Sequence, residues 1–293
     1  HGPGRPSREE RPGALPKDTD MKITLVQVPN DSVYGQYKDF DRKAIKRFPL
    51  NLACIASYVH KHDRHEVSCV DGDFNEFSIE ETARAVAAER PDVVGFTATT
   101  AIMDIVLKVA SLVKEAEPAV KIILGGPHVS AAPLAAAGHA CVDAAVFGEG
   151  EKTFMELIET FQASGDLSGI AGIAYRDHDG PRMNRKRELI TDLDTLPVPM
   201  WELFDYRGYH YFLIHGDEPY MVLTTSRGCP YDCIFCGSKT TWGRQVRSYS
   251  PGYVVAELAD LSARGIHNIS FVDDTFTVNK KRLKAICEGI TDS

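Results

Sequence analysis

Short apolar runs alternate with helical patterns along most of this chain, and this alternation limits the possible fold more than any other feature. The expected strands are 22–28, 66–70, 93–96, 121–124 and 144–147, and the expected helices are 50–62, 78–90, 101–115, 130–137 and 151–163. Strands that alternate with helices form parallel sheets covered by helices on both faces. The sequence therefore predicts an α/β fold with a doubly wound parallel sheet, whose ligand would lie at the carboxyl ends of the strands.

The rest of the chain divides into three further segments. Residues 1–20 are rich in Pro, Gly and charge, and we expect a disordered tail before a first domain at 21–165. Residues 166–205 are expected to form a hairpin, with strands at 173–176 and 187–190, and a linker. Residues 206–293 begin a second alternating unit, with expected strands at 220–225 and 268–272, helices at 253–264 and 280–290, and a loop at 226–250.

Composition excludes several classes of protein. The chain has 43% hydrophobic residues and a net charge of −8, so neither wholesale disorder nor a nucleic-acid partner is expected. No apolar stretch approaches the ~18 residues of a membrane span. Of the seven cysteines, three fall between 229 and 236, which indicates a metal or redox site in a reducing compartment, here taken as the cytoplasm.

The three clustered cysteines have the spacing C-x3-C-x2-C and follow an expected strand directly. Cysteine thiolates are the usual ligands of iron–sulfur clusters, and three of them leave one iron of a four-iron cluster open for another ligand. A zinc site or three structural cysteines are the alternatives, although the loop offers zinc no fourth Cys or His.

The segment from Arg227 to Cys236 resembles the signature of radical S-adenosylmethionine (SAM) enzymes. The resemblance implies a 4Fe–4S cluster on Cys229, Cys233 and Cys236, which cleaves SAM reductively, with Phe235 near the adenine. It also suggests that Asp273 or Asp274 approaches SAM, since they end a strand of a β/α partial barrel; the alternative is that they cap the next loop. Three basic residues follow the cysteines: Lys239, Arg244 and Arg247. They could offset the charge of the cluster and of the SAM carboxylate, but each of them is expected to be a solvated surface charge.

The first domain resembles the Rossmann-like cobalamin-binding domain found in front of many radical SAM enzymes. The resemblance rests on segments that occur in order: Pro49-Leu50, His65-Glu66-Val67, Pro91 to Gly95, Gly125-Gly126-Pro127-His128 and Gly148-Glu149-Gly150-Glu151. The implied cobalamin contacts are Asn30, Tyr34, Thr97, Thr99, Thr100, Gly125, Gly126, Pro127, Gly148 and Gly150. The alternative is a sheet that binds a nucleotide or nothing. The chain lacks the cobalt-ligating D-x-H-x-x-G motif, so the axial ligand stays open, and His128 is expected to be a surface residue.

Methylthiotransferases offer a second comparison, because their first domain carries three cysteines for another cluster. Here Cys54 falls within a helix, Cys69 within a strand and Cys141 in a connector, so buried structural cysteines are expected.

The resemblance implies a cobalamin-dependent radical SAM enzyme with a small-molecule substrate and an electron donor such as flavodoxin or ferredoxin. Methyl transfer to an unactivated carbon is the first expectation. An oxidative cyclase resembling anaerobic magnesium-protoporphyrin IX monomethyl ester cyclase is the alternative. Residues 220–293 contain two strand–helix units where relatives have about six, so a truncated, non-catalytic fragment that binds cobalamin and the cluster is a further expectation. The sequence does not select a substrate.

Overall fold

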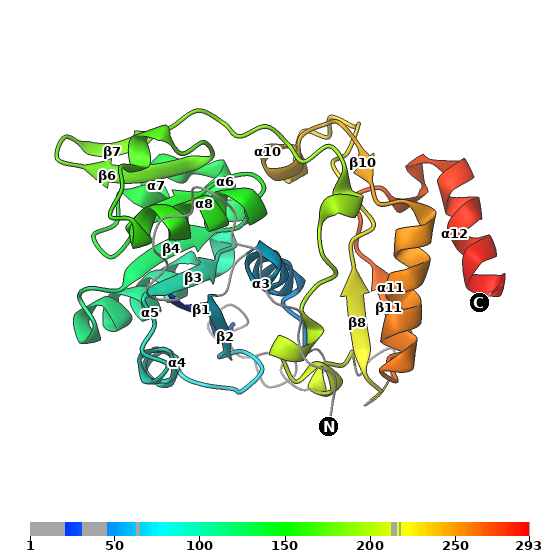
Figure 1. Ribbon diagram of the computed structural model, residues 1–293, viewed down its shortest axis with the longest axis horizontal. Coiled ribbons are helices and arrows are strands. Elements are labelled where there is room, and N and C mark those ends of the chain that lie inside the picture. The colour runs from blue at the N-terminus through cyan, green and yellow to red at the C-terminus, as the bar shows by residue number, and fades with distance from the viewer. Residues whose placement is uncertain (1–20, 31–45, 63–64, 212–215, 217, 293) are drawn as a thin grey trace, which may run out of the picture.

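The computed structural model describes residues 21–30, 46–62, 65–211, 216 and 218–292. The expected disordered tail at 1–20 and the expected cobalamin contact Tyr34 lie outside these residues. The described chain forms a first unit around a seven-stranded sheet and a smaller second unit beside it (Figure 1).

The sheet of the first unit confirms the predicted fold class. Its strands are β1 (Lys22–Gln27), β2 (Glu66–Asp71), β3 (Val93–Thr97), β4 (Lys121–Gly125), β5 (Ala144–Val146), β6 (Ile173–Asp177) and β7 (Gly180–Met183). They are ordered β2-β1-β3-β4-β5-β6-β7, and β1 to β5 pair in parallel. The chain goes from β1 outward to β2 and returns to β3 on the other side of β1. The carboxyl ends of β1 and β3 therefore frame the crevice where such sheets bind ligands.

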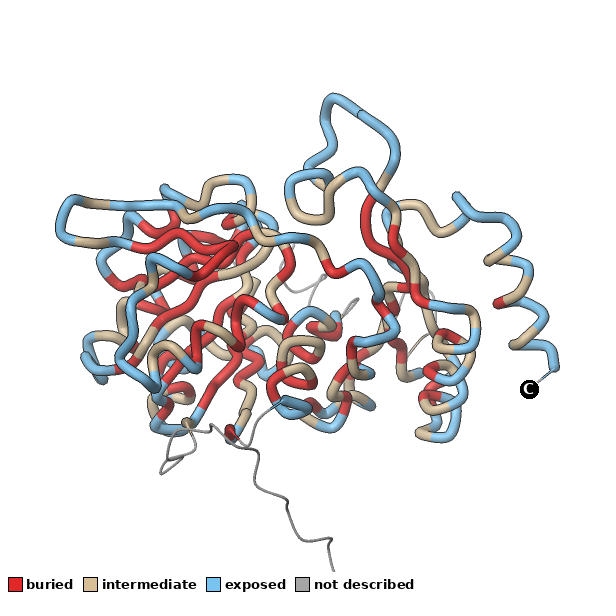
Figure 2. The backbone as a smooth tube through the Cα atoms, turned by 45° about the horizontal axis from the view of Figure 1, so that its top comes forward, coloured by how far each residue is buried: buried red, intermediate tan, exposed pale blue. Residues whose placement is uncertain are grey.

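Helices cover both faces of this sheet. They are α3 (Leu50–His62), α4 (Ile79–Ala88), α5 (Met103–Ala116), α6 (Pro127–Ala131), α7 (Pro133–Ala137) and α8 (Glu151–Gln162). Side chains alternate along β1, so Ile23 and Leu25 join the core beneath α3 and α8, whereas Val26 packs with α4 and α5 on the opposite face. Strands β1, β3, β4, β5 and β6 are accordingly buried along most of their length, as the tube in Figure 2 shows, whereas β2 and β7 at the two edges of the sheet are more exposed.

The hairpin after α8 differs from the prediction. Its first strand is β6, as expected, but its second strand is β7 at 180–183 and not 187–190. The chain reverses over His178 and Asp179, and Gly180, the first residue of β7, has a positive φ of +119°, which glycine adopts readily. Residues 187–190 leave the sheet because Arg187 bonds to α8, where its guanidinium contacts Thr153 and Glu156.

The second unit is built on two parallel strands. They are β8 (Tyr220–Leu223) and β11 (Asn268–Phe271), flanked by α11 (Pro251–Ala263) and α12 (Lys280–Asp292). Between β8 and α11, the segment expected to be a loop contains β9 (Ser226–Arg227), α10 (Ser238–Trp242) and β10 (Arg247–Ser248). The β9 and β10 strands pair antiparallel, which closes this segment into a long loop.

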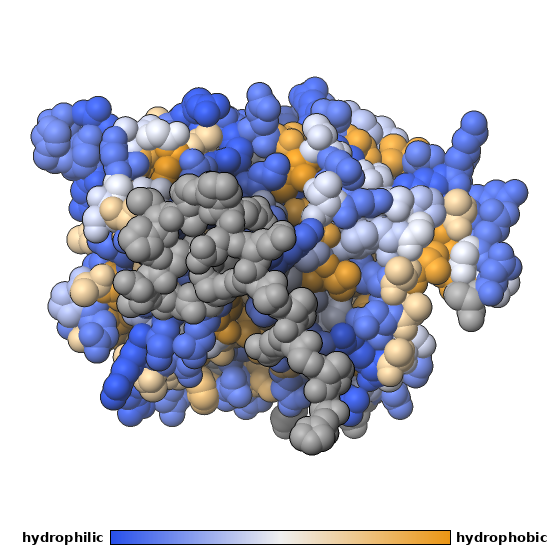
Figure 3. Space-filling model, in the orientation of Figure 1, coloured by the Kyte–Doolittle hydropathy of each residue, from blue (hydrophilic) through white to orange (hydrophobic). Residues whose placement is uncertain are grey.

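One hydrophobic core continues from the first unit into the second. Helix α3 lies between the large sheet and β8 (Figure 1), and Leu52 and Ala56 belong to the same core as Met221 and Leu261. Hydrophilic residues cover much of the visible surface in Figure 3, and hydrophobic residues show in several separate patches. None of the described helices has both the length and the apolar character needed to cross a membrane.

An aromatic cluster attaches the connecting segment to the first unit. Phe48 packs on Trp201, Phe204 and Tyr209, with ring centroids 5.0–5.3 Å apart. The buried hydroxyl of Tyr209 donates a 2.7 Å hydrogen bond to Oδ2 of Asp71, at the end of β2. Burial raises the pKa of Asp71 to about 6, although this hydrogen bond opposes the rise.

We expect Tyr209→Phe to lower the free energy of unfolding at pH 7 by about 1–3 kcal/mol, because a buried carboxylate oxygen loses its donor. The folded pKa of Asp71 already lies above its unfolded value, so stability falls as pH rises through the folded pKa. The variant raises that pKa further, and its loss of stability should therefore be smaller at pH 5 than at pH 7. Urea unfolding at both pH values measures this. Tyr206→Phe is the matched control, because no hydrogen bond of its hydroxyl joins it to the described residues; an equal loss in both variants would contradict the assignment.

Candidate functional site between the two units

A cavity of about 500 Å³ lies at the carboxyl edge of the large sheet. The ends of β1, β3, β4 and β5 form one wall, and residues of the second unit close the other, including Thr224, Arg227, Trp242 and Tyr249. The cavity therefore occupies the position predicted from the order of the strands. It borders both the first unit and the segment that carries the three clustered cysteines.

Most of the residues expected to contact cobalamin line this cavity. The lining includes Asn30, Thr97, Thr99, Gly125, Gly126, Pro127, Gly148 and Gly150. Among the described residues, Thr100 is the expected contact that does not line it; its hydroxyl lies 3.0 Å from Nδ1 of His128 instead. The structure thus brings these strand-end residues together, and their contact with cobalamin stays a prediction.

At Gly126 the wall of the cavity is formed by backbone and not by a side chain. Its φ of +100° is a backbone conformation that favours glycine. A Cβ atom at this position would lie 2.8 Å from both the backbone nitrogen and the backbone oxygen of Ala98. The turn after β4 therefore presents bare backbone beside Thr97, whose hydroxyl accepts a 2.6 Å hydrogen bond from the Asn51 amide. A large flat ligand can approach such a wall closely.

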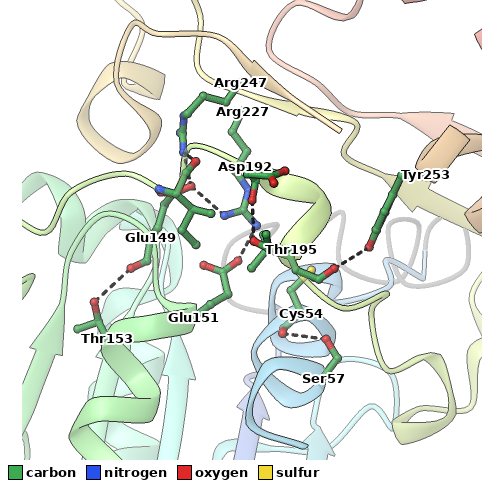
Figure 4. Close-up of polar contacts among 12 residues, drawn as sticks. Cys54, Ser57, Glu149, Glu151, Thr153, Asp192, Thr195, Arg227, Arg247 and Tyr253 are labelled. Carbon is green, nitrogen blue, oxygen red and sulfur yellow. Dashed lines mark hydrogen bonds and ion pairs between the residues drawn. The ribbon is translucent and has the colours of Figure 1, made fainter. Parts of the chain in front are cut away.

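A buried ion-pair cluster lies beside the cavity (Figure 4), and sequence reasoning did not predict it. Glu149 and Glu151, from the turn into α8, face Arg227 and Arg247 of the second unit. Arg227 donates through Nη1 to Glu149 at 2.9 Å and through Nη2 to Glu151 at 2.5 Å. Arg247 donates to the same Glu149 oxygen at 2.8 Å, and Oε2 of Glu149 accepts from the Ile190 N–H at 2.7 Å. All four charged side chains are at most 7% exposed.

Glu151 and Arg227 each shift the pKa of the other in the direction that keeps it ionised. Burial alone would raise the pKa of Glu151, but Arg227 lowers it below the ordinary value. Burial would likewise lower the pKa of Arg227, yet Glu151 raises it well above the ordinary value. Both groups therefore stay ionised. The expectation that Arg247 is a solvated charge is wrong, because burial against Glu149 holds it; Lys239 and Arg244 are exposed and pair with Asp232.

The three clustered cysteines follow Arg227 on one loop. Cys229 is half-buried, with its sulfur 3.1 Å from the Thr275 hydroxyl, whereas Cys233 and Cys236 are exposed. All three are free thiols, and the Cys236 N–H donates to the Cys233 carbonyl at 3.1 Å, which turns this end of the loop. Three free thiols on one turned loop suit an iron–sulfur cluster. Phe235 is 90% exposed beside them.

The two aspartates after β11 lie close to this loop. Asp273 accepts hydrogen bonds from the Thr225 N–H at 3.1 Å, from the Thr225 hydroxyl at 2.9 Å and from the Ser226 hydroxyl. Asp274 accepts from the Ser238 hydroxyl. Asp273 therefore fastens the end of β11 to the strand that leads into the cysteines. Contact of either residue with SAM, like that of Phe235, stays a prediction.

The three cysteines of the first unit are separate from that loop. Cys54 lies on α3 and borders the cavity, and burial, together with Glu151, raises its pKa to about 12. Burial also raises the pKa of Cys69 on β2, and Cys141 is buried. The raised pKa values of Cys54 and Cys69 keep both thiols protonated and poorly reactive. By exposure, Cys141 is buried as expected, whereas Cys54 and Cys69 are half-buried.

Two protein-family models match the chain. Residues 46–158 match the B12 binding domain, and residues 223–290 match the radical SAM superfamily. The chain is 37% identical over 270 residues to an uncharacterized methyltransferase of Pyrococcus horikoshii, covering 89% of this chain and 55% of that protein. It is 30% identical over 237 residues to the anaerobic magnesium-protoporphyrin IX monomethyl ester cyclase of a Synechocystis strain, covering 77% and 45%. The chain thus spans about half the length of these relatives.

The fold has a close counterpart among solved structures. The cobalamin-dependent SAM radical enzyme OxsB, solved with aqua-cobalamin and SAM bound, superposes with a TM-score of 0.75 at 21% identity, covering 94% of this chain and 37% of OxsB. The order of domains, the sheet and the position of the cysteine loop agree with the two family matches. The chain therefore belongs to the proteins that combine a B12-binding domain with a following radical SAM domain.

Proposed function

We propose that this protein acts in a cobalamin-dependent radical SAM reaction that transfers a methyl group to an unactivated carbon of a small molecule. One observation carries the proposal: the cavity at the edge of the B12-binding sheet is closed by the unit that carries the cysteine loop. Arg227 lines the cavity and precedes Cys229 by two residues. A ligand in the cavity and a cluster on the loop would therefore be neighbours.

The residues present suit each cofactor. Cys229, Cys233 and Cys236 supply the thiolates for a 4Fe–4S cluster, and the bare backbone at Gly126 suits a bulky corrin. When bound, cobalamin supplies a transferable methyl group, and the cluster with SAM supplies a radical able to break a C–H bond. The protein itself holds the two sites together and keeps water from the buried wall between them.

An electron donor such as flavodoxin or ferredoxin and a cytoplasmic location are parts of the same proposal. Cys233 and Cys236 are exposed, so an electron donor can reach the loop. Free thiols also persist best in a reducing compartment.

An oxidative cyclisation is the second candidate, favoured by the 30% identity to the cyclase. The two reactions differ in what becomes of SAM. Loss of its methyl group leaves S-adenosylhomocysteine, whereas reductive cleavage alone leaves methionine and 5′-deoxyadenosine. Anaerobic incubation with a reductant and chromatography of the nucleosides distinguish them: S-adenosylhomocysteine supports methyl transfer, and 5′-deoxyadenosine without it supports cyclisation.

We expect the anaerobically reconstituted chain to bind about four irons, and Cys233→Ala to lose them, because two thiolates do not hold a four-iron cluster stably. Iron and sulfide assays measure the loss, with electron paramagnetic resonance of the reduced protein. Cys287→Ala, which changes an exposed cysteine on α12, is the matched control. Binding of one zinc without iron would refute the cluster.

We expect Gly126→Ala to weaken cobalamin binding at least tenfold, because the new Cβ meets the backbone of Ala98 and moves the wall of the cavity. Gly169→Ala is the control, since a Cβ there meets nothing within 4 Å. Spectroscopic titration with hydroxocobalamin measures affinity, and thermal unfolding checks that both variants are folded. Equal affinities in a folded Gly126→Ala variant would contradict this placement of the ligand.

A further inference from the structure

Residues 148–151, which we call the linking loop, connect the cavity to the cysteine loop. Gly148 and Gly150 line the cavity. Between and after them, Glu149 and Glu151 hold Arg227 through two separate nitrogens. The linking loop therefore forms part of the cavity wall and, through the contacts of Glu149 and Glu151 shown in Figure 4, the anchor of the neighbouring unit.

The connection from Arg227 to the first cysteine is short and tightly fitted. Only Gly228 separates them, and its φ is +90°. A Cβ on Gly228 would lie 2.3 Å from the backbone oxygen of Gln245, so this glycine packs tightly against the backbone that precedes β10. Arg227 also pairs with Arg247 across β9 and β10. A shift of Arg227 would therefore move Cys229, because the one residue between them has little room to change its conformation.

The ion-pair cluster also leaves some hydrogen-bonding capacity unused. Oε2 of Glu151 and Nε of Arg247 are buried and make no hydrogen bond within the described residues. Buried polar atoms without partners are costly, so a small rearrangement that gives them partners is favourable. The ion-pair cluster thus holds the two units together, and a small movement of its side chains would be favourable if it gave these two atoms hydrogen-bond partners.

We propose that the linking loop couples the two cofactor sites, so that cobalamin in the cavity and the cluster on the cysteine loop each strengthen the other's binding. This inference rests on the proposed function, since it needs both sites to be real. A ligand that fixes Gly148 and Gly150 also fixes the carboxylates of Glu149 and Glu151, and through Arg227 the start of the cysteine loop. Such coupling is reciprocal by thermodynamic necessity.

The test measures the affinity of the whole chain for hydroxocobalamin with and without the reconstituted cluster. We expect the cluster to tighten cobalamin binding by about fivefold or more, the lower end of common coupling factors. Cobalamin should in turn shift the reduction potential of the cluster. Arg227→Lys keeps the positive charge but has one ammonium nitrogen in place of the two guanidinium nitrogens that reach Glu149 and Glu151 separately, so this factor should fall to about one. Glu202→Gln is the matched control, because it removes an exposed ion pair to Arg264 far from the cysteine loop in sequence.

The ratio of affinities separates coupling from a merely structural role. If Arg227 had only a structural role, its substitution would change the cobalamin affinity equally with and without the cluster, and the ratio of the two affinities would stay the same. A wild-type factor of one, or a full factor in Arg227→Lys, would overturn the coupling. If Arg227→Lys does not fold, Glu151→Gln replaces it, because its amide oxygen can still accept a hydrogen bond from Arg227. We expect the coupling factor of this variant to fall by at least half. An unchanged factor would contradict the coupling. Failure of either cofactor to bind the wild-type chain would refute the proposed function itself.

Discussion

The buried ion pairs among Glu149, Glu151, Arg227 and Arg247 constrain this structure more than any other polar interaction in its described part. Removing one member of a buried ion pair leaves an uncompensated charge, at a typical cost of about 3–5 kcal/mol. Both arginines come from the second unit and both glutamates from the first. The units must therefore dock in one arrangement, in which every charge meets its partner.

Docking in this arrangement also builds the cavity. The sheet supplies strand ends and bare glycine backbone, whereas Trp242 and Tyr249 come from the second unit. The Arg227 guanidinium lies 5.0 Å from the centre of the Trp242 ring, which also lines the cavity. Arg227 therefore belongs both to the ion-pair cluster and to the cavity wall. The hydrophobic core shared by Leu52, Ala56, Met221 and Leu261 supplies non-directional adhesion, and the ion pairs make the docking specific.

The predictions that succeeded depended on local patterns. Strand-end glycines were recognisable because tight turns beside a ligand need them, and the cysteine spacing lies within eight residues. The second hairpin strand was misplaced because the two-residue turn before Gly180 was not recognised. The sequence pattern predicts a surface charge at Arg247 because its partner Glu149 is 98 residues away in sequence. Nothing near Arg247 in the sequence indicates that carboxylate.

The sequence by itself determined the α/β fold, the sheet edge where a ligand would lie and the loop that offers three thiols. Each of these follows from a local pattern in the sequence: the hydrophobic periodicity, a turn residue or the spacing of the cysteines. Only the tertiary structure decided which charges are buried, that Cys54 and Trp242 border the cavity, and that Asp273 fastens β11 to the cysteine loop. Such contacts join residues far apart in the chain, and burial depends on how the two units pack, which no local pattern encodes.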